Sequence, residues 1–446
     1  MLIKNRKEIA TTDLRKKALD IIEEGIKRVL PLSLIKSTVK YNPSLKILNI
    51  CNIRYDLSQG RIFVIGGGKA SGSMAEALER IIGPENITDG VVNCVDNNYK
   101  TTKIKIIKAG HPIPDKRGIK GVKEMLGLKE KYSINKNDLI IGLISGGGSA
   151  LMSYPVEGIT LKDKQELTKL LLTVGAEIGE INILRKHLSK IKGGKLGSFF
   201  SPTPVVSLII SDVVGNRLDF IASGPTVSNS STFSDAYNIL EKYNLVNKAP
   251  KRIVDFLKKK RNLKERPKRL DNCKNLIIGD NKMALKAMAE KAKAMGFNPC
   301  IITSTQTGDP NLVSYKRARE IIKGKYGNCN VILIGGETTP KLPKNYGKGG
   351  RNQHYAAVSL LSMERYPGRW TLVAFSTDGS DFLPNVAGAI VDNNSLISAR
   401  KKGIDIQAYV NKYDSNTLLK KIGNSLIITG PTGTNVCDII LYILRR

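Results

Sequence analysis

The stretch RIFVIGGGKASGSMAEALERI, residues 61–81, decides the fold. It begins with a continuous apolar run, passes through three glycines and a lysine, and continues with Met, Ala and Leu at helical spacing. A continuous apolar run of this kind is typical of a strand that is buried on both faces, as in parallel sheets. The stretch therefore predicts a β-strand, a tight turn and an α-helix.

The same pattern of apolar strand and glycine-rich or polar turn recurs along the chain, at residues 138–152, 275–297, 330–339 and 371–381. Helices that connect buried parallel strands cover both faces of a sheet. We therefore predict an α/β protein with layered α/β/α domains and largely parallel sheets. In such sheets ligands bind beyond the carboxyl ends of the strands, where these turns lie.

The length of 446 residues favours two or three domains. A basic, proline-containing stretch interrupts the pattern at residues 246–272, and charge runs of this kind are usually solvated faces or linkers. We predict a Rossmann-like N-terminal α/β domain over residues 1–245, with glycine-rich anion loops. A basic linker over 246–272 and a C-terminal α/β domain over 273–446 follow. The first helix is expected from about Thr12 to Val29, with Thr11 or Thr12 as its N-cap.

Composition limits the classes of partner. The net charge of +32 suits either nucleic acid or small anions, but the cations are spread along the chain and few aromatic residues lie among them. We therefore expect a local anion site and no nucleic acid. No apolar run reaches the ~18 residues of a membrane helix, and the first 20 residues carry charges throughout, so we expect no membrane contact and a cytoplasmic location. The six cysteines form no CxxC pair, which argues against a zinc site.

Three segments have the composition of anion-binding sites. GGGKAS, residues 66–71, and SGGGSA, residues 145–150, let the backbone approach an anion closely, although each could also be a purely structural turn. INILRKHLSKIKGGKL, residues 181–196, carries cations on one helical face, although a solvated basic helix would have the same pattern. The candidate binding residues are Gly67, Gly68, Ser71, Ser145, Gly147, Gly148, Ser149, Arg185 and Lys192, and Lys69 adds a charge to the first turn.

Carboxylates follow three of the predicted strands. Asp212 follows the run LIIS, Asp378 holds the equivalent position in FSTDGSDF with Asp381 close behind, and Glu337 lies in GGETT. A carboxylate in this position can hold Mg²⁺ or orient a hydroxyl group, and it can also simply cap the turn. Several of them beside several anion turns favour a metal–nucleotide site.

Arg351 and Asn352 begin a helix after two glycines, and an arginine there can form two parallel bonds to a carboxylate or phosphate. The histidines, His111, His187 and His354, are expected to be structural. The chain has no GxSxG and no HExxH motif, which argues against covalent hydrolytic catalysis. Anion turns, a lysine, an arginine and carboxylates suit phosphoryl transfer, which depends mostly on positioning and charge stabilisation.

These motifs, in this order, resemble the glycerate 2-kinase family with its C-terminal MOFRL domain. The matching segments are GGGKAS, AGHPIPD, LISGGGSALM, NILRKHLSKIKGGKL, ISDVVGNRLDFIASGPT, GGETT, GKGGRNQ, STDGSD and TGPTGTNVCD, which span residues ~60 to ~440. The resemblance implies a two-domain α/β protein with its active site in the interdomain cleft. It also implies ATP as cosubstrate, Mg²⁺ as cofactor, D-glycerate as acceptor and 2-phosphoglycerate as product. A homodimer and a place in central sugar-acid breakdown are further expectations.

The resemblance also suggests roles for single residues. The family's lysine in the first glycine-rich turn and its arginine in GGRNQ correspond to Lys69 and Arg351. We expect Lys69 to stabilise the transferring phosphoryl group and Arg351 to bind the glycerate carboxylate or that phosphoryl group. Asp212 and Asp378 would hold Mg²⁺ or accept the hydroxyl proton. One departure from the family is FLPN, residues 382–385, where small polar residues are usual, and it leaves open how this loop meets the substrate.

Two other functions compete with the kinase. A hydroxypyruvate reductase would need a nicotinamide site, but GGGKAS has Ser71 where a GxGxxG fingerprint has its third glycine. A binding module for nucleotides or sugar phosphates would have no need to keep all four of Lys69, Arg351, Asp212 and Asp378. Binding of ATP rather than NADH would separate the kinase from the reductase.

Overall fold

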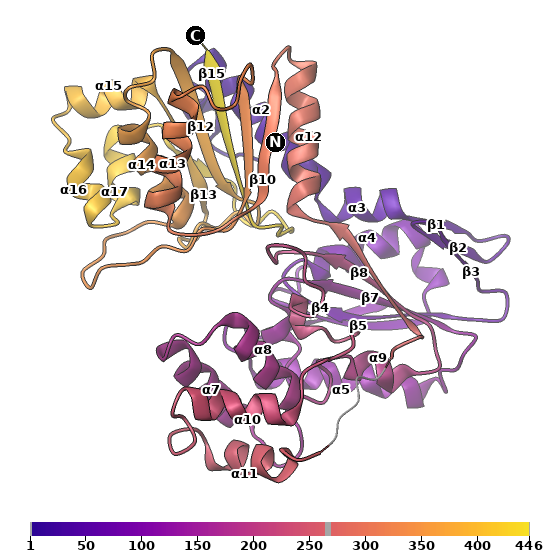
Figure 1. Cartoon of the computed structure of the whole chain (residues 1–446). Helices are drawn as coiled ribbons and strands as arrows, with labels where there is room; N and C mark the ends of the chain where they lie inside the picture. The colour runs from indigo at the N-terminus through magenta and orange to yellow at the C-terminus, as the bar shows by residue number, and fades with distance from the viewer. Residues whose placement is uncertain (1, 264–268, 446) are drawn as a thin grey trace. The chain divides into compact units, whose positions relative to one another are not determined.

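The computed structural model describes residues 2–263 and 269–445 and divides the chain into two compact units (Figure 1). Residues 34–278 form one unit, called the N-terminal unit below. Residues 1–33 and 279–446 form the other, called the C-terminal unit. The first 33 residues thus belong with the end of the chain, which the expected division at residues 245 and 273 did not include.

The N-terminal unit is built on a six-stranded sheet with the order β6-β5-β4-β7-β8-β9. Every pair from β6 to β8 is parallel, as the continuous apolar runs predicted. Helices α4 (Ser71–Ile82), α5 (Lys116–Lys131) and α9 (Lys195–Phe200) cover the faces of the sheet (Figure 1). The strands are β4 (Ile62–Gly67), β5 (Asp89–Cys94), β6 (Ile104–Lys108), β7 (Leu139–Ser145), β8 (Val205–Ile210) and β9 (Cys273–Gly279).

Two smaller parts complete this unit. An antiparallel sheet of β1 (Val39–Asn42), β2 (Ile47–Ile50) and β3 (Ile53–Asp56) follows α3 (Pro31–Thr38). A group of helices with an apolar core of its own contains α7 (Leu161–Thr173), α8 (Ile178–His187), α10 (Phe233–Lys242) and α11 (Lys251–Lys260). The short helices are α6 (Gly148–Leu151), η1 (Pro84–Asn86) and η2 (Ile221–Ser223).

The stretch expected as a linker, residues 246–272, is part of this unit wherever the structure describes it. Helix α11 is amphipathic and buries Ile253, Val254 and Leu257 against the helical group, so its charge run is the solvated face of a packed helix. Residues 264–268 of the stretch lie outside the described residues. The strand expected to open the second domain, β9, instead joins the first sheet beside β8.

The C-terminal unit has a six-stranded sheet of a different kind, with the order β10-β11-β15-β12-β13-β14. Strands β10 and β11 are parallel, whereas the four other neighbouring pairs are antiparallel. The apolar runs of β11 and β12 are continuous because both strands are buried on both faces, and burial does not fix direction. The strands are β10 (Pro299–Gln306), β11 (Val331–Gly336), β12 (Arg369–Ser376), β13 (Val386–Asp392), β14 (Leu426–Ile428) and β15 (Asp438–Arg445).

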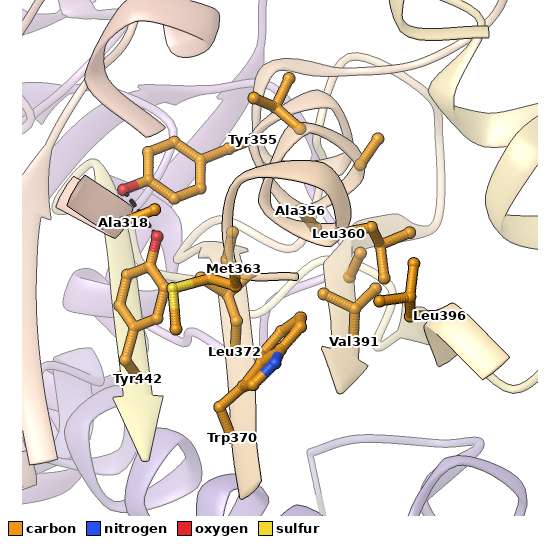
Figure 2. Packing of buried hydrophobic residues seen from close by; sticks show 14 of the residues in the cluster. Ala318, Tyr355, Ala356, Leu360, Met363, Trp370, Leu372, Val391, Leu396 and Tyr442 are labelled. Carbon is orange, nitrogen blue, oxygen red and sulfur yellow. Dashed lines mark hydrogen bonds between the residues drawn. The ribbon is translucent and has the colours of Figure 1, made fainter. Parts of the chain in front are cut away.

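Helices cover both faces of this sheet (Figure 1). On one face lie α2 (Asp13–Arg28) and α12 (Asn281–Ala294); on the other lie α13 (Pro310–Ile322), α14 (Arg351–Ser362), α15 (Asn393–Lys401), α16 (Ile406–Asn411) and α17 (Ser415–Ile422). Figure 2 shows the core beneath α14, where Tyr355 approaches Tyr442 and their hydroxyls lie 3.2 Å apart. This packing fixes the helix whose first residue is Arg351.

Helix α2 begins after Thr12, whose hydroxyl accepts the amide of Arg15, so the predicted N-cap is confirmed. Arg15 attaches the helix to the C-terminal unit. Its guanidinium lies 2.8 and 3.1 Å from the two carboxylate oxygens of Asp392, and both side chains are buried. The short helix α1 (Arg6–Ile9) precedes α2. Among residues 2–263 and 269–445, no helix has the length and apolar character needed to cross a membrane.

Candidate active site

The two glycine-rich turns of the N-terminal unit lie side by side. Strands β4 and β7 are parallel neighbours, so the turn at residues 66–71 and the turn at residues 145–149 leave the same edge of the sheet. A Cβ atom on Gly68 would lie 2.1 Å from Ser145 Oγ, and one on Gly148 would lie 2.6 Å from the carbonyl oxygen of Gly67. The glycines are therefore required for the turns to approach each other, whatever they bind.

Backbone amides of the first turn donate hydrogen bonds to other groups of the protein. The amides of residues 68–70 donate to Asn93 O (3.1 Å), Gly146 O (2.8 Å) and Ser145 Oγ (2.9 Å). The amides expected to cradle an anion thus already have acceptors. What the first turn presents is the side chain of Lys69, which is half-buried.

Ser71 and Ser145, two of the candidate ligand-binding residues, are completely buried. Their hydroxyl oxygens lie 3.3 Å apart, and the Ser71 hydroxyl also donates to Leu143 O at 3.0 Å. Both hydroxyls join the two turns to each other, so these residues position the turns.

The side chains of His111, Lys69 and Asp212 all lie close to the second turn. Gly147 has a φ of +78°, and a Cβ atom there would lie 2.9 Å from His111 Nε2 and 3.1 Å from Lys69 Cγ. A Cβ atom on Gly146 would lie only 1.7 Å from the carboxylate of Asp212, which follows β8. Lys69 and Asp212 therefore reach the same short turn from its two neighbouring strands, as the strand ends predicted.

The loop that contains Ala222 and Ser223 contacts the second turn and has a strained backbone. Ala222 and Ser223 have φ values of +51° and +60°, a left-handed conformation that costs a non-glycine residue roughly 1 kcal/mol or more. The Ser223 hydroxyl lies 2.7 Å from that of Ser149 and 3.1 Å from Asn182 Oδ1 of α8. Ser149 is thereby tied to helix α8.

Part of the basic segment after residue 181 is buried. Lys192 is 1% exposed and donates to the carbonyl oxygen of Met152 at 3.2 Å, at the end of the second turn's short helix. Arg185 is partly buried, and burial lowers the pKa of its guanidinium. Lys164 of α7 joins them and had no part in the predicted site. Its sequence signal was its spacing, since Lys164 occupies the same helix face as the buried Leu167 and Leu171.

In the C-terminal unit, an arginine and two carboxylates meet at one edge of the sheet. Register places the end of β11, the start of β15 and the end of β12 side by side, through Gly336, Asp438 and Ser376. Arg351 Nε lies 2.6 Å and Nη2 2.9 Å from the two oxygens of Asp438, and Nη1 lies 3.0 Å from Glu337 Oε1. The two bonds to Asp438 use two of the five N–H groups of Arg351 and fix the plane of its guanidinium.

Burial disfavours the charge of Arg351, but Asp438, Glu337 and Asp381 together raise the pKa of the guanidinium above its ordinary value. Asp438 was not among the predicted site residues. It is the first residue of β15 and the last residue of the family-like segment TGPTGTNVCD. A carboxylate at the start of a strand gave no signal, because the predictions considered only strand ends.

Asp381 holds the start of α14. Its carboxylate is completely buried and accepts the amides of Asn352 at 3.0 Å and Gln353 at 2.8 Å. Burial raises the pKa of Asp381 to about 6, and the two amides and Arg351 oppose that rise while Asp438 adds to it. Asn352 is itself buried, and its side-chain amide donates to Asp381 Oδ1 at 3.3 Å.

Asp378 lies two residues beyond the end of β12 and is half-buried. Its Oδ1 atom accepts the hydroxyl of Ser376 and the amide of Ser380, each at 3.0 Å. The strand β12 borders β15 at Asp438. Asp378 therefore leaves the same sheet edge as Asp438, the partner of Arg351.

A cavity of about 250 Å³ lies within the C-terminal unit beside this cluster. Its wall includes Glu337, Arg351, His354, Asp381, Phe382 and Ser415. His354 stacks on Tyr413 with ring centroids 4.0 Å apart and accepts or donates at 2.9 Å to Asn311 Oδ1, which agrees with its expected structural role.

Comparison with known proteins covers nearly the whole chain. Residues 17–258 match the family described as a domain of unknown function, DUF4147, and residues 330–438 match the MOFRL family. A glycerate 2-kinase of Pyrococcus horikoshii is 39% identical over 444 residues, with 97% of this chain and 98% of the relative covered. The chain belongs to the glycerate kinase family with a C-terminal MOFRL domain.

Two further members extend the comparison. The crystal structure of a glycerate kinase from Thermotoga maritima aligns with a TM-score of 0.83 at 35% identity, covering 96% of this chain and 99% of that one. A protein of Agrobacterium vitis named putative hydroxypyruvate reductase is 38% identical over 392 residues, covering 85% of this chain and 98% of the relative. Members of the glycerate kinase family thus carry two different functional names.

The donor set of this family member suits Mg²⁺ held mainly by a nucleotide. In the part of the chain that the structure describes, no three His, Cys, Asp or Glu side chains are grouped to hold a metal ion. Mg²⁺ commonly takes one or two carboxylates and completes its shell with phosphate oxygens and water. Asp212, beside Lys69 and the second turn, fits the single carboxylate that this arrangement needs.

Proposed function

We propose that the protein is an ATP-dependent glycerate 2-kinase that converts D-glycerate to 2-phosphoglycerate. The observation that carries the proposal is the similarity to a named glycerate 2-kinase over nearly the full length of both chains. The side-chain chemistry supports it, because Lys69, Arg351 and carboxylates at strand ends are the groups that phosphoryl transfer requires.

The reaction makes one bond and breaks one. The 2-hydroxyl oxygen of glycerate bonds to the γ-phosphorus of ATP, and the bond from that phosphorus to the β–γ bridging oxygen breaks to release ADP. The hydroxyl proton passes to a carboxylate. In our proposal Lys69 neutralises charge on the transferring phosphoryl group and Arg351 binds the carboxylate of glycerate.

We assign the two aspartates by their neighbours. Asp212 lies with Lys69 at the second glycine-rich turn, so we propose that it holds Mg²⁺, which would neutralise nucleotide phosphate charge when bound. Asp378 leaves the sheet edge that carries Asp438 and Arg351, so we propose that it accepts the hydroxyl proton. Asp212→Asn should raise the Mg²⁺ concentration needed for half-maximal rate, whereas Asp378→Asn should lower kcat at every Mg²⁺ concentration.

The position and orientation of the Arg351 side chain are fixed by Asp438, Glu337 and Asp381. Asp438 holds the guanidinium from one side, and Asp381 holds the first turn of α14. The neighbouring cavity of about 250 Å³ gives a small hydroxy acid room beside the arginine. An arginine oriented in this way loses little further side-chain freedom when it binds a carboxylate.

The reductase named in one relative is the alternative, and the first turn argues against it. A dinucleotide site places a pyrophosphate on the amides of the turn after the first strand. In this chain the amides of residues 68–70 are bonded to the protein, and Ser71, which is buried, replaces the third glycine. We therefore expect no NADH-dependent reduction of hydroxypyruvate.

The test is incubation of the full chain with Mg-ATP and D-glycerate, with the product identified by ³¹P NMR. A 2-phosphoglycerate signal is the expected result. A 3-phosphoglycerate signal would keep the kinase and reverse the position of transfer. No phosphoglycerate, together with oxidation of NADH on addition of hydroxypyruvate, would replace the kinase by the reductase. The cytoplasm, where ATP is available, is the expected compartment, and a homodimer remains a prediction that light scattering can test.

A further inference from the structure

Three cations of the N-terminal unit share a buried place without a counter-charge. Lys164 is 8% exposed and Lys192 is 1% exposed, while Arg185 is partly accessible. Among the described residues, no carboxylate pairs with any of the three, and the Lys164 ammonium has no hydrogen-bond partner at all. Burial of an ionised group without a partner costs several kcal/mol, so an arrangement of this kind calls for an explanation.

The cluster is not an ordinary salt-bridged surface. Lys186, the residue after Arg185 on α8, is 5% exposed and has Asp219 at 3.1 Å, so the same region does supply a carboxylate to a buried lysine. The carbonyl oxygen of Met152 is the partner of Lys192, and it carries only a partial charge. Within the part of the chain that the structure describes, no carboxylate therefore offsets a positive charge on Lys164, Arg185 or Lys192.

Several contacts place the cluster against the second glycine-rich turn. Lys192 reaches the carbonyl oxygen of Met152, the C-cap residue of the turn's short helix. Asn182, one helical turn before Arg185, is joined through Ser223 to Ser149 of the turn. Lys164 is carried by α7, and its neighbour Gln165 donates to Pro114 O at 2.7 Å, in the loop that contains His111.

The charges affect one another as close neighbours do. Burial and the nearby Arg185 and Lys195 lower the pKa of Lys164 to about 7. Burial, Lys164 and Arg185 also lower the pKa of Lys192 well below its ordinary value. Arg185 thus disfavours the charge of both lysines, and Lys164 disfavours that of Lys192, so an anion among them would relieve this repulsion.

We propose that Lys164, Arg185 and Lys192 form a phosphate-binding subsite that receives the phosphate chain of the nucleotide. The subsite rests on the proposed kinase function and adds Lys164 to its machinery. Two features favour a phosphate chain over the single carboxylate of glycerate: three cations match a multiply charged anion, and the amides of the first turn are already occupied. Side-chain cations thus take the role that backbone amides have in glycine-rich phosphate loops.

Calorimetric titration of the full chain tests the proposal without turnover. The ligands are ADP, inorganic pyrophosphate, D-glycerate and 2-phosphoglycerate. The proteins are the wild type, Lys164→Met, Arg185→Gln and the control Lys169→Met, which removes an exposed lysine from the same helix. We expect Lys164→Met and Arg185→Gln to weaken ADP and pyrophosphate at least tenfold. The control should stay within twofold, and all variants should keep the wild-type circular dichroism spectrum.

Three outcomes would overturn the subsite. The first is unchanged ADP and pyrophosphate affinity in both cluster variants. The second is a loss confined to glycerate or 2-phosphoglycerate, which would assign the cluster to the acceptor. The third is a wild type that binds neither ADP nor pyrophosphate. A protein that binds ADP through Lys164 but transfers no phosphate to glycerate would keep the subsite and refute the proposed function, so the two failures are distinguishable.

Discussion

Replacement of Lys164 by methionine should stabilise the unliganded protein, although it removes a residue that we assign to ligand binding. Lys164 is buried, and its surroundings lower its pKa from the ordinary 10.5 to about 7. The interval between these two values corresponds to about 5 kcal/mol, which is the largest destabilisation that the buried ammonium can impose. Methionine has a similar length, no charge and the flexibility to fill the space.

The sign of the pH dependence follows from the lowered pKa. Below about pH 7 the ammonium is protonated in both the folded and the unfolded chain, and the full cost of its burial is present. Between about pH 7 and 10.5 the folded chain holds a neutral amine, and the cost declines to zero. The stability gained by Lys164→Met should therefore be largest near pH 6 and should vanish near pH 10.5.

Chemical denaturation at pH 6 and pH 9.5 measures this effect. We expect a gain of at least about 2 kcal/mol at pH 6, which would raise the Tm of a unit of this size by roughly 4 to 8 °C. The exposed control Lys169→Met should change stability by no more than about 0.5 kcal/mol. A Lys164→Met protein that is less stable than the wild type, or whose gain is equal at both pH values, would refute the view that an uncompensated buried charge is present.

Other predictions concern catalysis and the attachment of α2. Lys69→Met should lower kcat by roughly two to three orders of magnitude with an unchanged Tm, and a change in KM alone would assign Lys69 to ground-state binding. Arg351→Ala and Asp438→Asn should each reduce kcat/KM for glycerate, and the double variant should lose much less than the product of the single losses, because Asp438 acts through the guanidinium that it orients. Additive losses would separate their roles. Asp392→Ala should destabilise the protein by about 3 to 5 kcal/mol in urea, because it leaves Arg15 buried and unpaired, and a loss below 1 kcal/mol would contradict that pairing.

Sequence patterns predicted local structure better than long-range partners. The apolar runs at β4, β7, β11 and β12 are strands because continuous burial on two faces has a clear signature. That signature is the same for parallel and antiparallel neighbours, so the mixed second sheet could not be foreseen. An apolar run also does not reveal which sheet its strand joins. The strand at residues 273–279 was therefore expected in the second domain, although it pairs with β8.

In the candidate site, too, positions that follow from local patterns were predicted better than positions that depend on distant contacts. Lys69 and Asp212 came from strand ends, where topology forces functional residues together. The function of a glycine or a serine was harder to predict. Ser71 and Ser145 serve the contact between two turns, which is a relation between segments 74 residues apart. Lys164 was missed because a single lysine among the apolar residues of a helix face does not change the predicted helix. Its burial on that face is nevertheless what reveals the cluster with Arg185 and Lys192.

The attachment of α2 to residues near the end of the chain also determines when this helix can pack during synthesis. The helix emerges early from the ribosome, but its partner Asp392 lies 377 residues later in the chain. At about 5 to 20 residues per second, the apolar face that contains Leu19, Ile22 and Ile26 waits roughly 20 to 80 s for the sheet that covers it. The N-terminal unit, a continuous segment, can complete its core meanwhile. A fragment that begins at residue 279 would lack this helix. The C-terminal unit should therefore need the first 33 residues, supplied in the same chain or as a separate peptide, to fold.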